Sequence, residues 1–472
     1  MSSTIAFAAS LFAAGISAQR AGTNTAETHL SLPVSECTAS GCTKLSTAIT
    51  LDANWRWTHS VDGSTNCYTG NEWDTSICTS PSVCATSCAL DGANYESTYG
   101  ISTSDDSLSL TFVTGANVGS RNYLMDDSGE KYQIFDLRNK EFTFDFDVSG
   151  LPCGLNGALY FVEMPADGGL SSQENTRPEP DMVLVTVTAS VHRTSSSSTA
   201  RYDLQSFRPM PFHLTDFLQA NIENWTPSSG DPNSGTGSKG ACCAEMDIWE
   251  ANSISSAFTP HPCNGTGLQV CESNTTCGAS DSRYDGICDK DGCDFNSYRM
   301  GNETFYGPES IIDTASPFTV VTQFITDDNT DNGTLVEIRR IYVQDGVVIQ
   351  NSASDIAGVD ASNSITEGLC SQQKTAFGDK NSFDARGGLA AMGKSFGRGM
   401  VLVMSVWDDY AANMLWLDST YPVEGTNLGA KRGTCDAESG VPATVEGAHP
   451  DATVKFSAIK FGALNSTFAA PV

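Results

Sequence analysis

The stretch Glu141-Phe-Thr-Phe-Asp-Phe-Asp-Val148 alternates polar and apolar side chains without interruption. A period of two is typical of a β-strand with one buried face, because successive side chains point to opposite sides of a sheet. Further strands are predicted at residues 157–163, 318–326, 335–344 and 400–407. Asp331-Asn-Gly333 and Asp345-Gly346 are typical of tight hairpin turns. Amphipathic helices are scarce, so the pattern predicts an all-β antiparallel sandwich with long loops.

Residues 245–250 read Glu-Met-Asp-Ile-Trp-Glu and set three carboxylates among apolar neighbours. On a helix, Glu245 and Glu250 would point well apart. On a strand, Glu245 and Asp247 share a face, whereas Glu250 has the opposite parity. A β-bulge at Ile248-Trp249 would add one residue and return Glu250 to the shared face.

Carboxylates gathered in apolar surroundings repel one another, which separates their pKa values and suits a pair of general acid and nucleophile. If the strand lies on a concave sheet, a carboxyl separation of about 5–5.5 Å would indicate a retaining glycosidase with a covalent intermediate. The alternative is an edge strand that happens to be acidic, and the spacing alone leaves it open.

Composition limits the cellular context. The net charge of −30 argues against nucleic acid or an anionic membrane as a partner. A short apolar stretch ending at Ile16-Ser-Ala18 predicts a signal peptide over residues 1–18, and therefore a secreted, extracellular protein. Sixteen cysteines predict disulfides rather than zinc, because they lack paired C-x-x-C knuckles with histidine partners. Residues 19–472 are expected to form one domain, without a linker or a carbohydrate-binding module. Five N-glycosylation sequons agree with secretion: Asn264, Asn274, Asn302, Asn332 and Asn465.

Several long motifs follow one another along the chain in the order found in a known family. They are Asp52-Ala-Asn-Trp-Arg-Trp-Thr-His59, Leu151-Pro-Cys-Gly-Leu-Asn-Gly-Ala-Leu-Tyr160, Cys242-Cys-Ala-Glu-Met-Asp-Ile-Trp-Glu-Ala-Asn-Ser253, Thr259-Pro-His-Pro-Cys263, Trp407-Asp-Asp-Tyr410 and Asn413-Met-Leu-Trp-Leu-Asp-Ser-Thr-Tyr-Pro422. The chain resembles the secreted cellobiohydrolases of glycoside hydrolase family seven over roughly residues 19–465, apart from one stretch.

The resemblance implies a curved, concanavalin-like jelly-roll sandwich whose long loops form a glucan-binding tunnel. It implies cleavage of β-1,4-glucan with retention and release of cellobiose, mainly from reducing ends. It also implies a monomer that acts on cellulose or another β-1,4-glucan without a cofactor or metal. By motif, Glu245 resembles the nucleophile, Glu250 the general acid/base and Asp247 the residue that orients Glu245. His261 resembles a histidine near the leaving group, and a purely structural role for it stays open.

Substrate-binding residues follow from the same resemblance. Sugar rings present apolar C–H faces that stack on aromatic side chains. Trp55 and Trp57 are expected on one face of one strand, where both could contact a glucan. Asp289-Lys-Asp-Gly-Cys-Asp294 is rejected as a calcium loop, because its glycine is misplaced and no closing glutamate follows. The expected substrate contacts are Trp55, Trp57, Tyr160, Trp407 and Trp416, and on the product side Arg283, Asp291, Asp294 and Arg432.

The segment 176–217 departs from the family. A motif with two cysteines is expected there, and a longer cysteine-free stretch stands in its place. The resemblance would pair those missing cysteines with Cys242 and Cys243. One hypothesis is an error in the gene model, and the alternative is a genuine insertion that leaves two thiols beside the nucleophile. The resemblance pairs the other fourteen cysteines as 37–42, 67–88, 78–84, 153–435, 263–288, 271–277 and 293–370.

Two other functions stay open. One is an endo-β-1,4-glucanase of the same family, with an open cleft in place of the tunnel. The other is a glucan-binding protein that the altered segment has disabled. The stretch from Trp225 to Gly237 and the loop from Tyr421 to Cys435 favour the tunnel form.

Overall fold

The computed structural model describes residues 20–168, 225–232, 234–236, 240–271 and 273–468. The predicted signal peptide (residues 1–18) and the anomalous segment 176–217 lie outside the described residues. In the described part of the chain, no helix has both the length and the apolar character needed to cross a bilayer.

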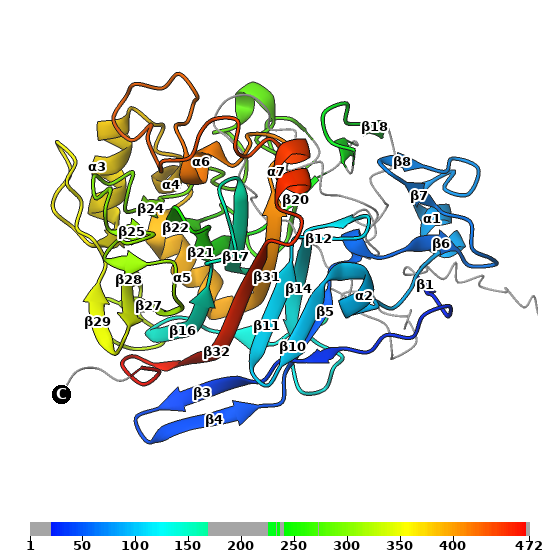
Figure 1. The fold of residues 1–472 in the computed structure, drawn as a ribbon, viewed down its shortest axis with the longest axis horizontal. Coiled ribbons are helices and arrows are strands. Elements are labelled where there is room, and N and C mark those ends of the chain that lie inside the picture. The colour runs from blue at the N-terminus through cyan, green and yellow to red at the C-terminus, as the bar shows by residue number, and fades with distance from the viewer. Residues whose placement is uncertain (1–19, 169–224, 233, 237–239, 272, 469–472) are drawn as a thin grey trace, which may run out of the picture.

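Two large, mainly antiparallel sheets dominate the structure (Figure 1). The first sheet contains β3 (Val34–Thr38), β4 (Gly41–Leu45), β10 (Ile101–Ser104), β11 (Ser107–Thr111), β16 (Lys140–Asp147), β27 (Phe318–Thr326), β28 (Leu335–Gln344), β29 (Val347–Gln350), β30 (Ser364–Thr366) and β32 (Thr453–Ala463). The second sheet contains β2 (Leu30–Ser31), β5 (Ala48–Leu51), β14 (Ser120–Met125), β15 (Ile134–Phe135), β17 (Leu155–Val162), β21 (Glu245–Ala251), β22 (Ser256–His261), β24 (Phe295–Asn296) and β31 (Met400–Asp408).

The alternating stretch that predicted the fold forms β16. Its phenylalanines Phe142, Phe144 and Phe146 are fully buried. Phe146 packs edge-on against Trp249 of the second sheet, with ring centroids 5.2 Å apart. An apolar face on each sheet therefore closes one core, as expected for a sandwich. The all-β prediction is confirmed, and all five predicted strands form.

Short elements gather at the two ends of the sandwich. Figure 1 shows α1, β6, β7 and β8 at one end, and α3 and α4 at the other. The short strands are β1 (Arg20–Ala21), β6 (Thr58–Ser60), β7 (Tyr68–Thr69), β8 (Glu72–Trp73), β9 (Cys88–Leu90), β12 (Val113–Thr114), β13 (Asn117–Val118), β18 (Thr226–Pro227), β19 (Gly235–Thr236), β20 (Gly240–Cys242), β23 (Gln269–Cys271), β25 (Tyr306–Gly307) and β26 (Ile312–Asp313). The helices are η1 (Ala53–Trp55), α1 (Pro81–Ser87), α2 (Tyr95–Tyr99), η4 (Ser280–Ser282), α3 (Glu367–Phe377), α4 (Ser382–Ala385), α5 (Gly388–Arg398), α6 (Leu415–Asp418) and α7 (Pro442–Ala448).

Two helices of eleven residues, α3 and α5, are regular elements that the alternation did not predict. The Thr366 side chain caps the start of α3, and Gly378 ends it in the left-handed conformation. In α5, Phe396 packs against Phe324 of the first sheet, with ring centroids 5.1 Å apart. Gly393 allows this close approach, because a Cβ there would lie 2.8 Å from the Leu335 Cβ.

All seven disulfides expected from the resemblance are present. Cys153–Cys435 joins residues 282 positions apart, so it restrains the unfolded chain more than the short-range bridges do. Cys242 and Cys243 take part in none of these seven bridges.

Candidate active site

The three carboxylates lie on β21, which carries the predicted bulge. Against β22, Asp247 pairs with Thr259 and Glu250 pairs with Ala257. Three residue positions along β21 therefore lie opposite two positions along β22. The register against β17 shifts in the same way. Met246, Ile248 and Trp249 all belong to the apolar core. The extra residue therefore turns Glu250 to the face that carries Glu245 and Asp247, and all three carboxylates are almost fully buried.

Asn156 of β17 holds one oxygen of Glu250. Its side-chain amide donates to Glu250 Oε1 over 2.9 Å, and its own Oδ1 accepts from the backbone N–H of Ala251 over 3.0 Å. The amide orientation is therefore fixed by both contacts. With Oε1 engaged as an acceptor, Oε2 is the Glu250 oxygen that can carry a proton. The sequence motif contained Asn156, but no feature of the sequence singled it out.

His261 of β22 links Asp247 to the neighbouring loop. Its Nδ1 lies 2.9 Å from the backbone oxygen of Asp289, and a carbonyl oxygen can only accept, so Nδ1 carries a hydrogen. Its Nε2 lies 3.0 Å from Asp247 Oδ2, so the imidazole and the carboxyl group are in direct contact beside Glu245.

Tyr160 of β17 lies on the same face and is fully buried. Burial raises the pKa of its phenol, and the nearby charge of Glu245 and Asp247 raises it further, against the opposing effect of Arg121. Tyr160 therefore keeps its proton throughout the physiological range and can donate a hydrogen bond next to the carboxylates.

The predicted tryptophans form two groups, Trp55 with Trp57 and Trp407 with Trp416. The expectation that Trp55 and Trp57 share one strand face is wrong, because Trp55 ends η1 and Trp57 precedes β6. The Asp52 side chain accepts from Asn54 N over 2.8 Å and turns the chain into this 3₁₀ helix. Trp57 is 38 % exposed, and its ring lies 4.3 Å from that of His59. It offers an accessible aromatic face.

Trp407 and Trp416 lie nearly parallel, with ring centroids 6.2 Å apart. Trp407 stands near the end of β31, and Trp416 lies in α6. Trp416 is held by a hydrogen bond of 2.9 Å from its Nε1 to Asp409 Oδ2. Trp416 also lines a pocket beyond the carboxylates.

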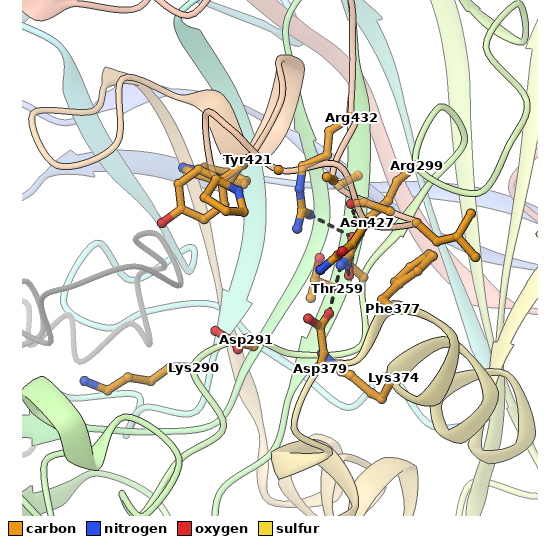
Figure 2. Close-up of a pocket in the computed structure, with 18 of the residues that line it drawn as sticks. Thr259, Lys290, Asp291, Arg299, Lys374, Phe377, Asp379, Tyr421, Asn427 and Arg432 are labelled. Atoms are coloured by element: carbon orange, nitrogen blue, oxygen red, sulfur yellow. Dashed lines mark hydrogen bonds and ion pairs between the residues drawn. The ribbon is translucent and has the colours of Figure 1, made fainter.

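That pocket brings together all four residues predicted for the product side, namely Arg283, Asp291, Asp294 and Arg432 (Figure 2). Arg283 Nε donates to Asp291 Oδ1 over 2.7 Å. Although burial alone would raise it, Arg283 and Lys374 hold the pKa of Asp291 well below its usual range. Burial, together with the neighbouring Arg299, lowers the pKa of Arg432 to about 10. Asp291 is therefore ionised and Arg432 protonated at neutral pH.

Four further charged residues line this pocket and were not predicted from the sequence: Arg299, Lys374, Asp379 and Lys290. Arg299 donates to Asp294 and, over 2.9 Å, to Asp379 Oδ2. Its guanidinium lies 4.3 Å from the centre of the Phe377 ring, at the end of α3. Burial lowers the pKa of Lys290 to about 7. Lys374 lies on α3 and Asp379 directly follows it, and this helix was not predicted from the sequence.

The adjacent cysteines Cys242 and Cys243 are buried immediately before β21. Burial raises the pKa of Cys242 to about 12. Burial and the nearby Glu245 raise the pKa of Cys243 well above its usual value. Both side chains therefore carry protonated thiols, which are poor nucleophiles.

Buried carboxylates on one face of a bulged strand, together with two groups of tryptophans and a polar pocket, define a glycoside hydrolase of the β-sandwich class. Comparison with known proteins gives the family. The profile of Glycosyl hydrolase family 7 matches residues 21–179 and 203–468, and the chain belongs to this family. The unmatched residues 180–202 fall within the anomalous segment.

Solved structures of the same family are similar over almost the whole chain. A family 7 cellobiohydrolase from Daphnia pulex is 46% identical, with a TM-score of 0.86, covering 95% of this chain and 100% of its own. A cellobiohydrolase from Melanocarpus albomyces, complexed with cellotetraose, is 41% identical with a TM-score of 0.83 and the same coverage. The endocellulase EGI of Humicola insolens is 31% identical with a TM-score of 0.75, again over 95% and 100% of the two chains.

Proposed function

We propose that the protein is a retaining cellobiohydrolase that cleaves β-1,4-glucosidic bonds of cellulose and releases cellobiose mainly from reducing ends. The observation that carries the proposal is the bulged strand β21, which turns Glu245, Asp247 and Glu250 to one face. Higher identity to cellobiohydrolases than to the endocellulase supports the exo-acting form.

In the proposed reaction, Glu250 donates its proton to the glycosidic oxygen while Glu245 attacks the anomeric carbon from the opposite side of the sugar. Cellobiose departs as the leaving group with that proton, and the remaining glucan chain is held as a glycosyl ester on Glu245. Glu250 then removes a proton from a water molecule that hydrolyses this ester, so two inversions give net retention. Asp247, in contact with His261, would orient Glu245 for attack.

The proposed substrate is a single glucan chain. Trp55 and Trp57 would stack on sugars at one end of the path, and Trp407 and Trp416 on sugars near the site of cleavage. Tyr160 would donate to the sugar bound at Glu245. The pocket of Arg283, Asp291, Asp294 and Arg432 would hold the released cellobiose. The cellotetraose in the Melanocarpus albomyces complex supports a glucan as the ligand.

We also propose that residues 19–472 form one catalytic domain, secreted to the extracellular medium and acting as a monomer. The seven disulfides support an oxidising compartment, because cytosolic thiols are kept reduced.

The test is product analysis on cellulose and on cello-oligosaccharides, with Glu245→Gln and Glu250→Gln as variants. We expect cellobiose as the main soluble product, and proton NMR should show the β-anomer first. Glu245→Gln should abolish turnover. New reducing ends found mainly in the insoluble fraction would instead indicate an endoglucanase. Equal inactivity of wild type and both variants, with glucan binding retained, would indicate a binding protein.

A further inference from the structure

Arg340 lies in the core of the sandwich, behind the strand that carries the carboxylates. It belongs to β28 of the first sheet, and its side chain points inward between Ile338 and Tyr342. The residue is 1 % exposed. Its guanidinium carbon lies 4.3 Å from the ring centre of Phe258 and 5.2 Å from that of Trp249, both on the second sheet. Arg340 therefore spans the space between the two sheets.

The guanidinium ends at the bulge itself. Arg340 Nη2 donates to the backbone carbonyl of Ile248. Ile248 pairs with no residue of β17 and with no residue of β22. It is the only residue of β21 that lacks a partner on both neighbouring strands. A bulge removes a residue from the hydrogen-bond ladder, and a buried carbonyl without a donor costs free energy. Arg340 supplies the donor that the two neighbouring strands do not.

Burial of the Arg340 guanidinium costs desolvation free energy, which a specific interaction must offset. Among the described residues, no carboxylate lies within salt-bridge distance of its guanidinium, and the ionisable groups that act on its charge are the phenols of Tyr342 and Tyr306. Burial lowers its pKa, yet arginine stays protonated in proteins. An apolar residue of the same length would fill the core at lower desolvation cost.

We propose that Arg340 is a positioning residue for catalysis: by binding the Ile248 carbonyl it fixes the bulge, and so the placement of Glu250 relative to Glu245. The inference rests on the catalytic roles proposed for those two glutamates. Ile248 lies between Asp247 and Glu250, so relaxation of the bulge would turn or shift Glu250 first. A displacement of about 1 Å at a reacting group can cost about 10²-fold in rate.

The test compares Arg340→Met with Arg340→Lys on aryl β-cellobiosides. Methionine keeps an apolar stem but has no donor, whereas lysine keeps both a charge and a donor. We expect Arg340→Met to fold, to lower kcat by about 10²-fold, and to change KM much less. The loss should be larger for a phenol leaving group than for dinitrophenol, because only the poorer leaving group needs a proton from Glu250. Arg340→Lys should recover part of the loss.

Arg339→Met is the matched control. Arg339 is the next residue of the same strand, but it faces solvent and pairs with Glu337 over 2.8 Å. It should keep wild-type kcat and leaving-group dependence. A folded Arg340→Met enzyme with wild-type kcat would overturn the inference, as would an equal loss for both leaving groups.

Two further results separate the possible failures. If Arg340→Met does not fold, Phe258→Leu decides, because it removes the ring that packs against the guanidinium and so loosens the contact of Arg340 with the Ile248 carbonyl. A leaving-group-dependent loss in that variant supports the inference, and wild-type behaviour overturns it. If Glu245→Gln and Glu250→Gln keep activity, the proposed function itself is wrong, whatever Arg340 does.

Discussion

Asn156 offers a sharp test of how the structure sets the acidity of the proposed acid/base. Its amide donates to Glu250 Oε1 over 2.9 Å. A hydrogen bond to the charged form of a carboxyl group favours that form. Asn156→Ala removes the donor, so the protonated form of the acid should persist to higher pH.

The magnitude follows from the strength of that bond. Hydrogen bonds to charged groups contribute about 1.5–3 kcal/mol and those to neutral groups about 0.5–1.5 kcal/mol, so the bond favours the charged form by about 1–1.5 kcal/mol. Because one pH unit corresponds to about 1.4 kcal/mol, the alkaline limb of the kcat/KM profile should move upward by about one pH unit. The same substitution leaves the buried N–H of Ala251 without its acceptor, which should destabilise the fold by about 1–3 kcal/mol.

The assay is the pH dependence of kcat/KM on a soluble aryl β-cellobioside, because that parameter reports the free enzyme. Asn351→Ala is a matched control: Asn351 is buried and donates to the Asn363 carbonyl over 3.1 Å, outside the site. It should lose stability without moving either limb. A folded Asn156→Ala enzyme whose alkaline limb stays in place would refute the reasoning.

Three more predictions concern other parts of the molecule. Burial raises the pKa of Asp418 to about 7; between pH 4 and pH 7 the unfolded chain loses a proton that the folded protein keeps, so stability falls with rising pH. Asp418→Asn should remove that slope from a plot of Tm against pH, and a parallel slope in the variant would contradict it. Arg432→Ala should weaken inhibition by added cellobiose about tenfold or more, as expected for a lost charged donor, and an unchanged inhibition constant would show that the pocket does not hold product. Peptide mass spectrometry of the secreted protein should fail to detect Tyr202–Arg208 if the segment is an annotation error, and detection of that peptide would establish a genuine insertion.

The features that depend on the alternation of side chains along a strand could be predicted from the sequence. Phe142, Phe144 and Phe146 face the core as their period of two requires. The bulge also followed from parity, because three buried carboxylates could share one face only if one residue were added between Asp247 and Glu250. Both arguments succeed because a strand has only two faces, and a residue that belongs to one is excluded from the other.

The prediction for Trp55 and Trp57 failed for a local reason. Their spacing of two suggested a strand, but the Asp52 side chain caps a 3₁₀ turn there. Between the two tryptophans, Arg56 is buried and paired with Glu27 and the backbone of Leu51. A side-chain cap and a long-range ion pair outweigh a two-residue alternation, and neither can be read from a short window of sequence.

Arg340 shows what parity could still have revealed. In β28 the inward positions are Ile338, Arg340 and Tyr342, whereas Arg339 faces solvent. The adjacent arginines look equivalent in the sequence, yet only one of them can face the core. A charged residue at an inward position needs a partner there, because an uncompensated buried charge is costly. The partner that needs such a donor is the carbonyl that the bulge releases from the ladder. An arginine at inward parity and a bulged strand on the facing sheet are therefore two parts of one arrangement, and each predicts the other.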